Sequence, residues 1–320
     1  MRAVIQPVYG PPDVVRVDEV PDPVAADDQV LIEVRAVSLN GSDRENLAGR
    51  PAYARIAGLH RPRNPVPGSD VAGVVVAVGP EVTAFAPGDE VFGELPGYRG
   101  GLAERVAVRP TTLVRKPAGL TFVEAAAIPQ SGCIALRATR GLSGEPGARV
   151  LVNGAGGAGG ALLVGLARHH GAEVTAVDRR DKADHLRRLG ADQVVAHEDE
   201  DWADHHDRYD LVVDLIGRRS PWRVGRALRR GGRYRMVGGR TDLLLAMVTV
   251  GPLLGRATGR SIGMLVVPQS AVDLAEVTSL VTGGAVRPAI DRIVRLDDVP
   301  AAFRRLAAGD NSGKIVVEIG

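Results

Sequence analysis

The sequence predicts a two-domain α/β protein, in which a β-rich domain precedes a doubly wound parallel sheet. Three observations support this prediction. Residues 1–120 consist of short apolar runs separated by Pro, Gly and Asp, and from Arg149 onward strand-like and helix-like segments alternate. A glycine-rich turn joins the first strand of that alternation to its first helix. At 320 residues, the chain is also too long for one compact core.

The first domain, predicted over residues 1–122, has the strand spacing of a small antiparallel barrel or sandwich. Its strand-like runs are VLIEVRAV (30–37), VAGVVVAVG (71–79), DEVFGEL (89–95) and AERVAVRP (103–110). After the first run the chain becomes polar at VSLNGSDREN (37–46). Asn, Gly, Ser and Asp in a row are typical of a turn or a helix N-cap, and the same side chains can line a pocket.

The second domain is predicted over residues 123–267. Thr121, with Glu124 three residues later, forms a capping-box pattern that opens a helix. The alternation then requires strands at 149–153, 172–178, 192–196, 209–217, 233–239 and 261–267, with helices at 161–171, 182–190 and 222–232. The last of these strands lies at an edge of the sheet.

Residues 268–320 are expected to return to the first domain. They contain a helix at 270–284, a strand at 288–296, a helix at 297–310 and a closing strand, GKIVVEI, at 313–319. The closing strand needs an antiparallel neighbour, which the parallel sheet does not offer.

Composition excludes several classes of function. The net charge is +2 and no basic stripe is interleaved with aromatic residues, so we expect neither nucleic-acid nor membrane-surface binding. The longest apolar stretch, Leu243–Leu254, contains Pro252 and is too short to span a bilayer. Cys133 is the only cysteine, which rules out an internal disulfide and a thiolate zinc cluster. With no signal-peptide pattern at the N-terminus, we expect a cytoplasmic protein.

The glycine-rich turn is the strongest functional signal in the chain. A strand, the turn, a helix and a second strand ending at Asp178 follow one another, as in a dinucleotide-binding unit. Glycines there allow a tight turn and let bare backbone approach a pyrophosphate, which the helix N-terminus stabilises. The coenzyme-binding residues predicted from this motif are Asn153, Gly154, Ala155, Gly156, Gly157, Ala158, Gly159 and Gly160.

The tip of the second strand gives conflicting information about the coenzyme. A carboxylate at Asp178 suits the ribose hydroxyls of NAD and repels a 2′-phosphate. Arg179 and Arg180 follow at once, and an arginine can accept that phosphate. We therefore predict binding of NAD(P)H at these three residues, leaning to NAD(H) and leaving NADP(H) open.

Several stretches resemble the medium-chain dehydrogenase/reductase superfamily: VPGSDVAGVVVAVGPEVTAFAPGDEVFG (66–93), GGLAERVAV (100–108), NGAGGAGG (153–160) and NSGKIVVEIG (311–320). RPRNPVPGSDVAG (61–73) is especially similar to the reticulon-interacting-protein-like members of the quinone oxidoreductase branch. The resemblance covers essentially the whole chain. It implies a GroES-like β-barrel catalytic domain, a Rossmann domain, and coenzyme contacts from Gln130, Gly238, Gly239 and Lys314.

The departures from the zinc-dependent members are informative. In alignment with their catalytic zinc ligands, Asn40 stands at the first cysteine, Ser69 and Asp70 at the His-Glu pair, and Gln130 near the last ligand. Amide and hydroxyl side chains are poor zinc ligands. The four-cysteine structural zinc lobe is also missing between Phe92 and Gly101. The resemblance thus implies a zinc-independent enzyme with no metal site.

Without a metal, the implied reaction is NAD(P)H-dependent reduction of quinones or of activated C=C bonds in α,β-unsaturated carbonyls. Asn40 is the first candidate for a hydrogen-bond donor to the developing enolate. Asp43 is a second catalytic candidate, although capping of the following helix is the favoured interpretation. Tyr53 is a candidate proton donor, with solvent as the alternative.

Other interpretations stay open at this level. A redox-inactive dinucleotide-binding protein, crystallin-like or a scaffold, is one, and a biosynthetic tailoring enzyme that uses the same cleft is another. His60, Arg61 and Arg63 suit either a solvated loop or contact with an anionic substrate. Leu243–Leu254 suits either the wall of the substrate site or a dimer contact. Relatives pair the sixth strand across a dimer axis, so we expect a homodimer that binds a small-molecule substrate.

Overall fold

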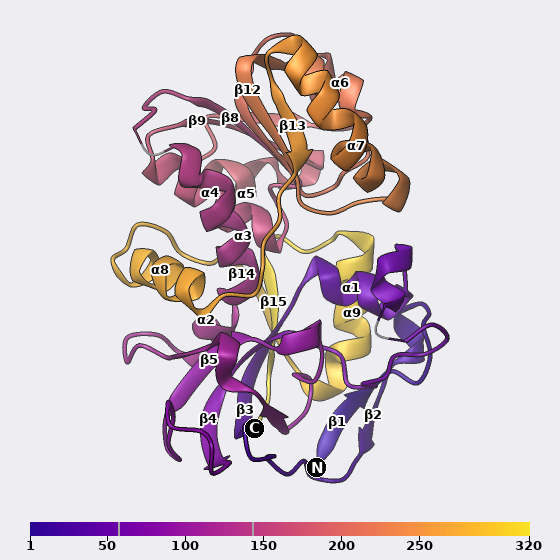
Figure 1. Cartoon of the computed structure of the whole chain (residues 1–320), viewed down its shortest axis with the longest axis vertical. Coiled ribbons are helices and arrows are strands. Elements are labelled where there is room, and N and C mark those ends of the chain that lie inside the picture. The colour runs from indigo at the N-terminus through magenta and orange to yellow at the C-terminus, as the bar shows by residue number, and fades with distance from the viewer. Residues whose placement is uncertain (57, 143) are drawn as a thin grey trace. The chain divides into compact units, whose positions relative to one another are not determined.

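The structure is a computed structural model that describes residues 1–56, 58–142 and 144–320. The chain divides into two compact units (Figure 1). The barrel unit comprises Met1–Cys133, Gln269–Gly283 and Ile290–Gly320. The sheet unit comprises Ile134–Pro268 and Gly284–Ala289. Among the described residues, no helix is both long and apolar enough to cross a membrane.

The barrel unit is built on a seven-stranded sheet with the order β14-β15-β3-β4-β5-β7, in which β6 also pairs with β3. The strands are β3 (Val30–Leu39), β4 (Asp70–Val78), β5 (Glu90–Glu94), β6 (Arg105–Val108), β7 (Leu113–Arg115), β14 (Ile290–Arg295) and β15 (Lys314–Glu318). The closing strand β15 runs antiparallel to β3, with Ile315 opposite Leu39. The predicted return of the C-terminal segment to the first domain is therefore seen in the strand pairing.

Helices and a small ribbon cover this sheet. The ribbon is β1 (Arg2–Ile5) with β2 (Arg16–Glu19), and the helices are α1 (Gly41–Ala48), α2 (Phe122–Ala126), α8 (Ala271–Thr282) and α9 (Val299–Ala308). Inward-facing side chains of β3, β4 and β15 pack with Phe303 of α9 in one apolar core. That core holds the strand ends that carry the polar residues described below.

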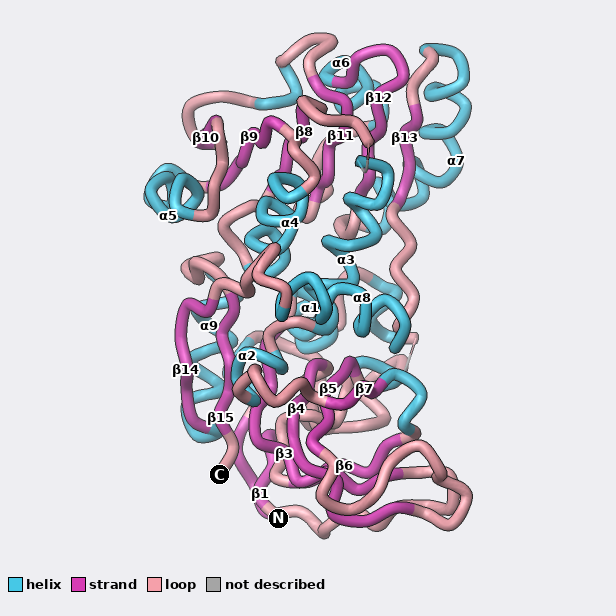
Figure 2. Tube along the Cα trace, turned by 90° about the vertical axis from the view of Figure 1, so that its left-hand side faces the viewer, coloured by secondary structure: helices cyan, strands magenta, loops and turns pink. Residues whose placement is uncertain are grey.

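The sheet unit is a six-stranded parallel sheet of order β10-β9-β8-β11-β12-β13, visible in that order in Figure 2. The strands are β8 (Arg149–Asn153), β9 (Glu173–Asp178), β10 (Gln193–Ala196), β11 (Tyr209–Asp214), β12 (Leu228–Met236) and β13 (Ser261–Met264). Its helices are α4 (Ala158–His169), α5 (Ala183–Arg188), α6 (Pro221–Ala227) and α7 (Thr241–Thr258). Figure 1 shows α4 and α5 on one side of the strands and α6 and α7 on the other, as right-handed crossovers require.

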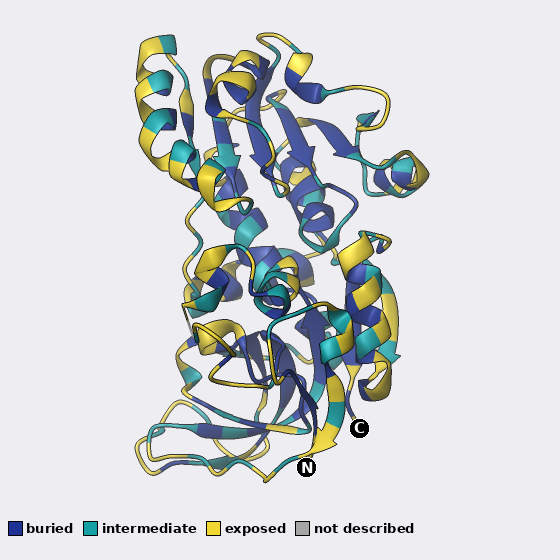
Figure 3. Cartoon of the chain, turned by 90° about the vertical axis from the view of Figure 1, so that its right-hand side faces the viewer, coloured by how far each residue is buried: buried dark blue, intermediate teal, exposed yellow. Residues whose placement is uncertain are grey.

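The burial pattern follows this layering. Most strands of the two units are largely buried, β2 and β14 being exceptions, whereas the helices expose their outer faces (Figure 3). Parallel strands that are covered on both faces are buried along their length, as in β11, whose six residues are all buried, including Asp210 and Asp214 toward its two ends. The predicted doubly wound sheet is confirmed.

Three details differ from the sequence prediction. The helix expected after Thr121 is interrupted, because α2 ends at Ala126 and a new helix, α3 (Pro129–Thr139), starts at a proline. Strand β12 begins at Leu228, inside the segment expected to be helical. The first unit extends to Cys133 rather than to residue 122, because α2 packs against β3, β4, β5 and β15.

Candidate active site

The polar segment after β3 forms the N-terminus of α1. Asn40 has the extended backbone of an N-cap residue, and the Asp43 carboxylate accepts a hydrogen bond from the Asn40 N–H at 2.8 Å. This is the backbone half of a capping box, so the structural interpretation of Asp43 agrees with the geometry. The Asn40 side chain is directed elsewhere, toward Ser69, which precedes β4, and Lys314 of β15.

A buried lysine ammonium is the centre of the candidate site. Lys314, at the start of β15, is 1% exposed and its Nζ donates to Asn40 Oδ1, to Ser38 Oγ at 3.0 Å and to Asp70 Oδ2 at 3.3 Å. Asp70 is fully buried, and its carboxylate also accepts from Ser38 Oγ at 3.2 Å. An ion pair removed from water needs such additional hydrogen bonds to offset its desolvation.

This arrangement fixes the orientation of the Asn40 amide. A lysine ammonium only donates, so the amide oxygen must face it. The amide nitrogen accordingly donates to Ser69 Oγ at 3.1 Å. One of its two N–H groups is thereby used, and within the described residues no hydrogen bond of the second is seen; Asn40 as a whole is 2% exposed.

A second chain of contacts leads from α1 to β5. The Ser42 hydroxyl donates to Gln130 Oε1 at 2.9 Å, and Gln130 Nε2 donates to Glu94 Oε1 at 2.5 Å. The backbone N–H of Gln130, in the first turn of α3, donates to both carboxylate oxygens of Asp70 at 3.3 Å. Ser42, Asp70 and Gln130 thus belong to one network with Asn40 and Lys314.

Burial perturbs two carboxyl groups of this network. Burial raises the pKa of Asp43 to about 7, and the nearby Asp70 adds to the effect, against the hydrogen bond from Asn40. Burial and then Asp70 raise the pKa of Glu94 to about 8. Asp43 Oδ1 is buried without a partner among the described residues. A carboxyl group in such surroundings tends to keep its proton at neutral pH.

Tyr53 stands apart from this network. Its side chain lies on a 3₁₀ turn (Ala52–Arg55), is 38% exposed, and its hydroxyl donates to Glu45 Oε2 at 2.7 Å. Burial and this hydrogen bond to Glu45 raise the pKa of Tyr53. The structure therefore gives Tyr53 a structural partner, and its role as proton donor stays a prediction. His60, Arg61 and Arg63 are exposed, as expected for a solvated loop.

The donor set around Lys314 does not fit a zinc ion. The oxygens of Ser38, Asn40 and Asp70 already converge on an ammonium group, and amide and hydroxyl oxygens are weak zinc ligands. No group of three or more His, Cys, Asp or Glu side chains placed to hold a metal occurs within residues 1–56, 58–142 and 144–320.

In the sheet unit, the glycine-rich turn lies at the carboxyl end of β8, where doubly wound sheets bind dinucleotides. Gly154 has a φ of 87°, which favours glycine. Gly160 lies so close to the Ala155 backbone that a Cβ atom would come within 2.3 Å of it. Gly157 precedes the first turn of α4, whose free N–H groups suit a pyrophosphate.

Asp178 closes this turn from the tip of β9. Its carboxylate accepts from the Gly156 N–H and from the Arg179 N–H, both at 2.8 Å, and Lys182 Nζ lies 3.4 Å away. Arg179 pairs with Asp181 at 2.5 Å. Sequence reasoning missed Lys182, although its spacing of four residues from Asp178 was a usable signal.

The guanidinium of Arg180 is also occupied. It pairs with Asp199, and its backbone N–H donates to Glu198. Both arginines that the sequence offers as phosphate acceptors therefore have carboxylate partners in the structure.

A buried carboxylate organises the neighbouring strand ends. Asp214, the last residue of β11, accepts from Asn153 Nδ2, from the Tyr234 hydroxyl and from two backbone N–H groups of the next loop, at 2.8–2.9 Å. Gly238 and Gly239 follow β12 at the same edge, and Gly239 has a φ of 143°. Sequence reasoning missed Asp214. Gly238 and Gly239 remain predicted coenzyme contacts.

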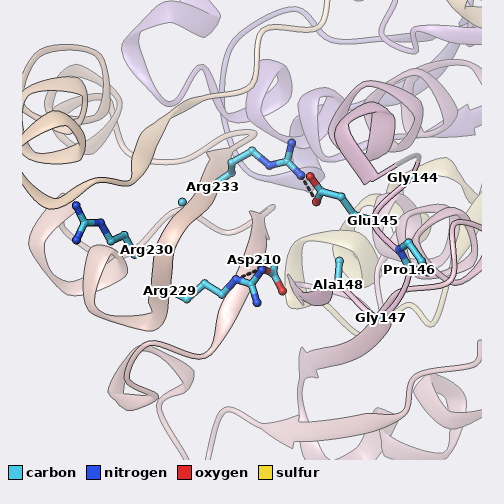
Figure 4. A pocket seen from close by; sticks show the side chains of 10 residues that line it. Gly144, Glu145, Pro146, Gly147, Ala148, Asp210, Arg229, Arg230 and Arg233 are labelled. Carbon is cyan, nitrogen blue, oxygen red and sulfur yellow. Dashed lines mark hydrogen bonds and ion pairs between the residues drawn. The ribbon is translucent and has the colours of Figure 1, made fainter.

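A groove of about 500 Å³ at the opposite edge of the sheet carries three arginines (Figure 4). Arg229 pairs with Asp210, and Arg233 pairs with Glu145 at 3.3 Å. Asp210 lies near the start of β11 and Arg229 near the start of β12, so the groove is at the amino edge of the parallel strands. Coenzymes bind such sheets at the carboxyl edge, so this groove is not the dinucleotide site.

Lys314 was expected near the coenzyme phosphates, and Gln130 near the coenzyme. In the structure both side chains bond within the barrel unit, as described above. Their contact with a coenzyme stays a prediction. The sequence singled out Asn40 and Asp43, whose catalytic roles stay predictions, and it did not single out Ser38, Glu94 or the pairing of Lys314 with Asp70.

Family models match both halves of the chain. An alcohol dehydrogenase GroES-like domain matches residues 26–118, and a zinc-binding dehydrogenase domain matches residues 189–317. The mitochondrial NAD(P)H oxidoreductase RTN4IP1 of Mus musculus is 30% identical over 91% of this chain and 82% of its own length. The chloroplastic NADPH-dependent alkenal/one oxidoreductase of Arabidopsis thaliana is 32% identical over 99% of this chain and 79% of its own length.

The structural comparison agrees. The quinone oxidoreductase of Coxiella burnetii superimposes with a TM-score of 0.90 at 27% identity, over 100% of this chain and 99% of that one. The fold, the glycine-rich turn and these relatives lead to one assignment. The chain belongs to the medium-chain dehydrogenase/reductase superfamily, in its RTN4IP1-like and quinone oxidoreductase branch, and is an NAD(P)H-dependent oxidoreductase.

Proposed function

We propose that this protein reduces the activated C=C bond of α,β-unsaturated carbonyls, and also quinones, without a metal ion and with a preference for NADH. The observation that carries the proposal is the Lys314 ammonium held by Ser38, Asn40 and Asp70. Asn40 and Asp70 stand where zinc-dependent relatives have a metal ligand and its neighbouring carboxylate, so an internal cation replaces the metal.

The chemistry of this donor set selects the substrate. Oxidation of an ordinary alcohol needs its hydroxyl pKa lowered, which a zinc ion does and an amide does not. Hydride addition to an enone instead produces an enolate, which hydrogen-bond donors can stabilise. The free N–H of the oriented Asn40 amide is such a donor, and removal of one donor of this kind typically costs ~2.7–4 kcal/mol of transition-state stabilisation.

The coenzyme supplies the hydride when bound, and the sheet unit offers the groups that hold it. The N–H groups of the glycine-rich turn and the first turn of α4 suit the pyrophosphate. The carboxylate of Asp178 suits the ribose hydroxyls. Each of these groups lies at the carboxyl edge of the parallel sheet.

The proposed preference for NADH follows from charge around the tip of β9. Arg179 is paired with Asp181, and Arg180 with Asp199. Lys182 contacts Asp178 itself. The 2′-phosphate of NADPH would lie near the Asp178 carboxylate, and each of the three nearby cations already has a carboxylate partner. The ribose hydroxyls of NADH can instead donate hydrogen bonds to Asp178.

The test is a turnover assay that follows consumption of the reduced coenzyme. A simple enone and 9,10-phenanthrenequinone are offered as acceptors, each with NADH and with NADPH, to the wild-type protein and to Asn40→Ala. We expect turnover of both acceptors, faster with NADH, and a loss of about 100-fold or more in kcat for the enone in Asn40→Ala. The matched control is Asn46→Ala, a partly buried residue on the same helix whose side chain lies outside the Lys314 network.

The proposal fails if the coenzyme binds tightly but neither acceptor is turned over. That outcome would favour the redox-inactive binding protein. A preference of more than tenfold for NADPH would contradict the coenzyme assignment alone and leave the reaction intact.

A further inference from the structure

Glu94 occupies a place in the barrel unit that the reaction described so far does not use. It is the last residue of β5, is 9% exposed, and lies directly opposite Asp70 in the antiparallel register of β4 and β5. Residues paired in this way have Cβ atoms about 4.5–5.5 Å apart. Two buried carboxyl groups therefore face each other from neighbouring strands.

The cations nearby cannot neutralise both of them. Lys314 Nζ lies 3.3 Å from Asp70 Oδ2, so of the two carboxyl groups it forms its ion pair with Asp70. The guanidinium of Arg99 donates to three neutral oxygens, on Gln6, Asn46 and Asn64. Two adjacent carboxylates with a single ammonium do not both ionise readily, so the proton resides on the carboxyl group that lacks the ammonium contact, which is Glu94.

The charged surroundings of Glu94 come from four elements. The titratable and charged groups that act on it are Asp70 of β4, Asp43 of α1, Lys314 of β15 and Tyr98 of the turn at Pro96–Tyr98. Burial and Asp70 raise its pKa to about 8, with Lys314 acting in the opposite direction. The group therefore holds its proton at neutral pH and regains it from solvent after giving it up.

The hydrogen bonds locate the proton on one oxygen. Ser42 donates to Gln130 Oε1, which turns the Gln130 amide so that Nε2 donates to Glu94 Oε1. Oε1 is thus an acceptor, and because the carbonyl oxygen of a carboxylic acid is the better acceptor, we assign the proton to Oε2. Within the described part of the chain, the carboxyl group makes no other hydrogen bond, so the O–H is not committed to a protein acceptor.

We propose that Glu94 is the acid that protonates the α-carbon during enone reduction. This inference rests on the proposed function. Once hydride has reached the β-carbon, the former C=C electron pair is delocalised over an enolate, whose oxygen faces the N–H of Asn40. The enolate pair then forms the α-C–H bond with the Glu94 proton, the O–H bond breaks, and its electrons stay on Glu94 as a carboxylate. Solvent returns the proton.

Quinones provide the internal comparison. Hydride addition to a quinone gives a hydroquinone anion, whose charge is on oxygen and which solvent protonates without a positioned acid. Removal of the Glu94 proton should therefore affect enones and spare quinones. The variant Glu94→Gln keeps the shape of the side chain and an oxygen for Gln130 but has no acidic proton.

The experiment measures kcat and KM for an enone and for 9,10-phenanthrenequinone between pH 6 and 10. The proteins are wild type, Glu94→Gln, Glu94→Asp and the matched control Glu90→Gln, an exposed residue at the other end of β5 whose carboxylate pairs with Lys116. We expect Glu94→Gln to lower kcat for the enone by about 100-fold, within the range for loss of a general acid, and to leave quinone kcat nearly unchanged. The kcat of the wild type for the enone should decrease above pH 8. The kcat for the quinone should not show this decrease. Glu94→Asp should retain part of the enone activity.

Reduction in D₂O adds a readout that a structural role would not change. Wild type should deliver deuterium to one face of the α-carbon of a prochiral enone, and Glu94→Gln should lose that facial selectivity.

An equal loss of enone and quinone activity, or unchanged enone activity and selectivity, would overturn the role of Glu94. If Glu94→Gln does not fold, the wild type alone still tests the proposal. A wild-type kcat for the enone that does not decrease above pH 8 would overturn the role of Glu94. Failure of the wild type to reduce either acceptor would instead overturn the proposed function.

Discussion

At the scale of single residues, the site depends on how a few side chains satisfy one another. Lys314 and Asp70 are both buried, and each has further hydrogen bonds, which makes their separation from water tolerable. Because the ammonium only donates, it determines that the oxygen of the Asn40 amide faces Lys314 and the nitrogen faces Ser69. Lys314 therefore controls the orientation of Asn40. We propose that Asn40 contacts the substrate, whereas Lys314 does not.

This dependence gives a prediction for Lys314→Met. The substitution removes the ammonium and leaves the Asp70 carboxylate buried without its cation, a change that typically costs about 3–5 kcal/mol of unfolding free energy. Urea denaturation followed by circular dichroism measures the loss. The double variant Lys314→Met, Asp70→Asn should recover part of it, because no unpaired charge remains. Equal stability of the single and double variants would contradict the proposed pairing.

The sequence allowed some of these residues to be predicted. Asn40 and Asp43 follow a strand in a cap-like order, a local pattern that the structure reproduces. The pairing of Lys314 with Asp70, and of Asp70 with Glu94, depends on the register of β15, β3, β4 and β5, which are far apart in sequence. No local pattern encodes that register.

At the scale of elements, the alternation of strand-like and helix-like segments correctly predicted the succession of strands along the chain. The boundaries of these elements depended on tertiary packing. Residues Leu228–Gly232 have no strand-like alternation, yet they open β12, where Leu228 pairs with Tyr209 of β11. The helix after Thr121 breaks at Ala127 and Ile128, just before Pro129, because Pro suits the first turn of a helix but not its interior. The capping box of Thr121 and Glu124 is present as predicted.

The tip of β9 belongs to this scale, because it joins strand, glycine-rich turn and the following 3₁₀ turn. Asp178→Ser removes the carboxylate while keeping an acceptor for the Gly156 N–H, and it frees Lys182. We expect the ratio of kcat/KM for NADPH over NADH to rise by about tenfold or more, since one repulsive charge is replaced by an unpaired cation.

The control for this prediction is Asp184→Ser. Asp184 is the exposed acid at the start of α5 that pairs with Arg187, so its loss removes a charge without touching Asp178. The same shift in both variants would mean that net charge, rather than the position of Asp178, sets the preference.

At the scale of the whole molecule, the buried carboxyl groups link stability to pH. Asp43 and Glu94 have native pKa values of about 7 and about 8, well above their ordinary values of 3.8 and 4.5. Between these limits the native state binds more protons than the unfolded state, so its stability falls as the pH rises. The contribution is fully present below the ordinary pKa values and is lost as the pH passes through the native ones.

We therefore expect the unfolding free energy of the wild type to decrease from pH 6 to pH 9, by roughly 2–4 kcal/mol. Urea denaturation at several pH values measures it. Glu94→Gln should flatten the decrease, because an amide does not titrate, and Glu90→Gln should not. A wild-type stability that rises over this range would show that neither carboxyl is held protonated in the native state.

Assembly is set by surfaces that the single chain leaves uncovered. Strand β13 is an edge of the parallel sheet, and an unpaired edge is a place where another chain can add. Beside it, α7 exposes Leu245, Val248 and Leu253, which are 58–64% accessible. An apolar helix face next to a free strand edge favours the homodimer, which we propose forms through β13 and α7.

Light scattering on the eluted protein should give twice the chain mass of 33.6 kDa. In the double variant Val248→Glu, Leu253→Glu, charge would be buried at the proposed contact, so the mass should fall to that of a single chain at micromolar concentration. Val24→Glu, an equally apolar residue that is 86% exposed on the barrel unit, is the matched control and should leave the dimer intact. A wild-type protein that elutes as a single chain would contradict the proposed assembly, and dissociation by Val24→Glu would place the contact on the barrel unit instead of on α7.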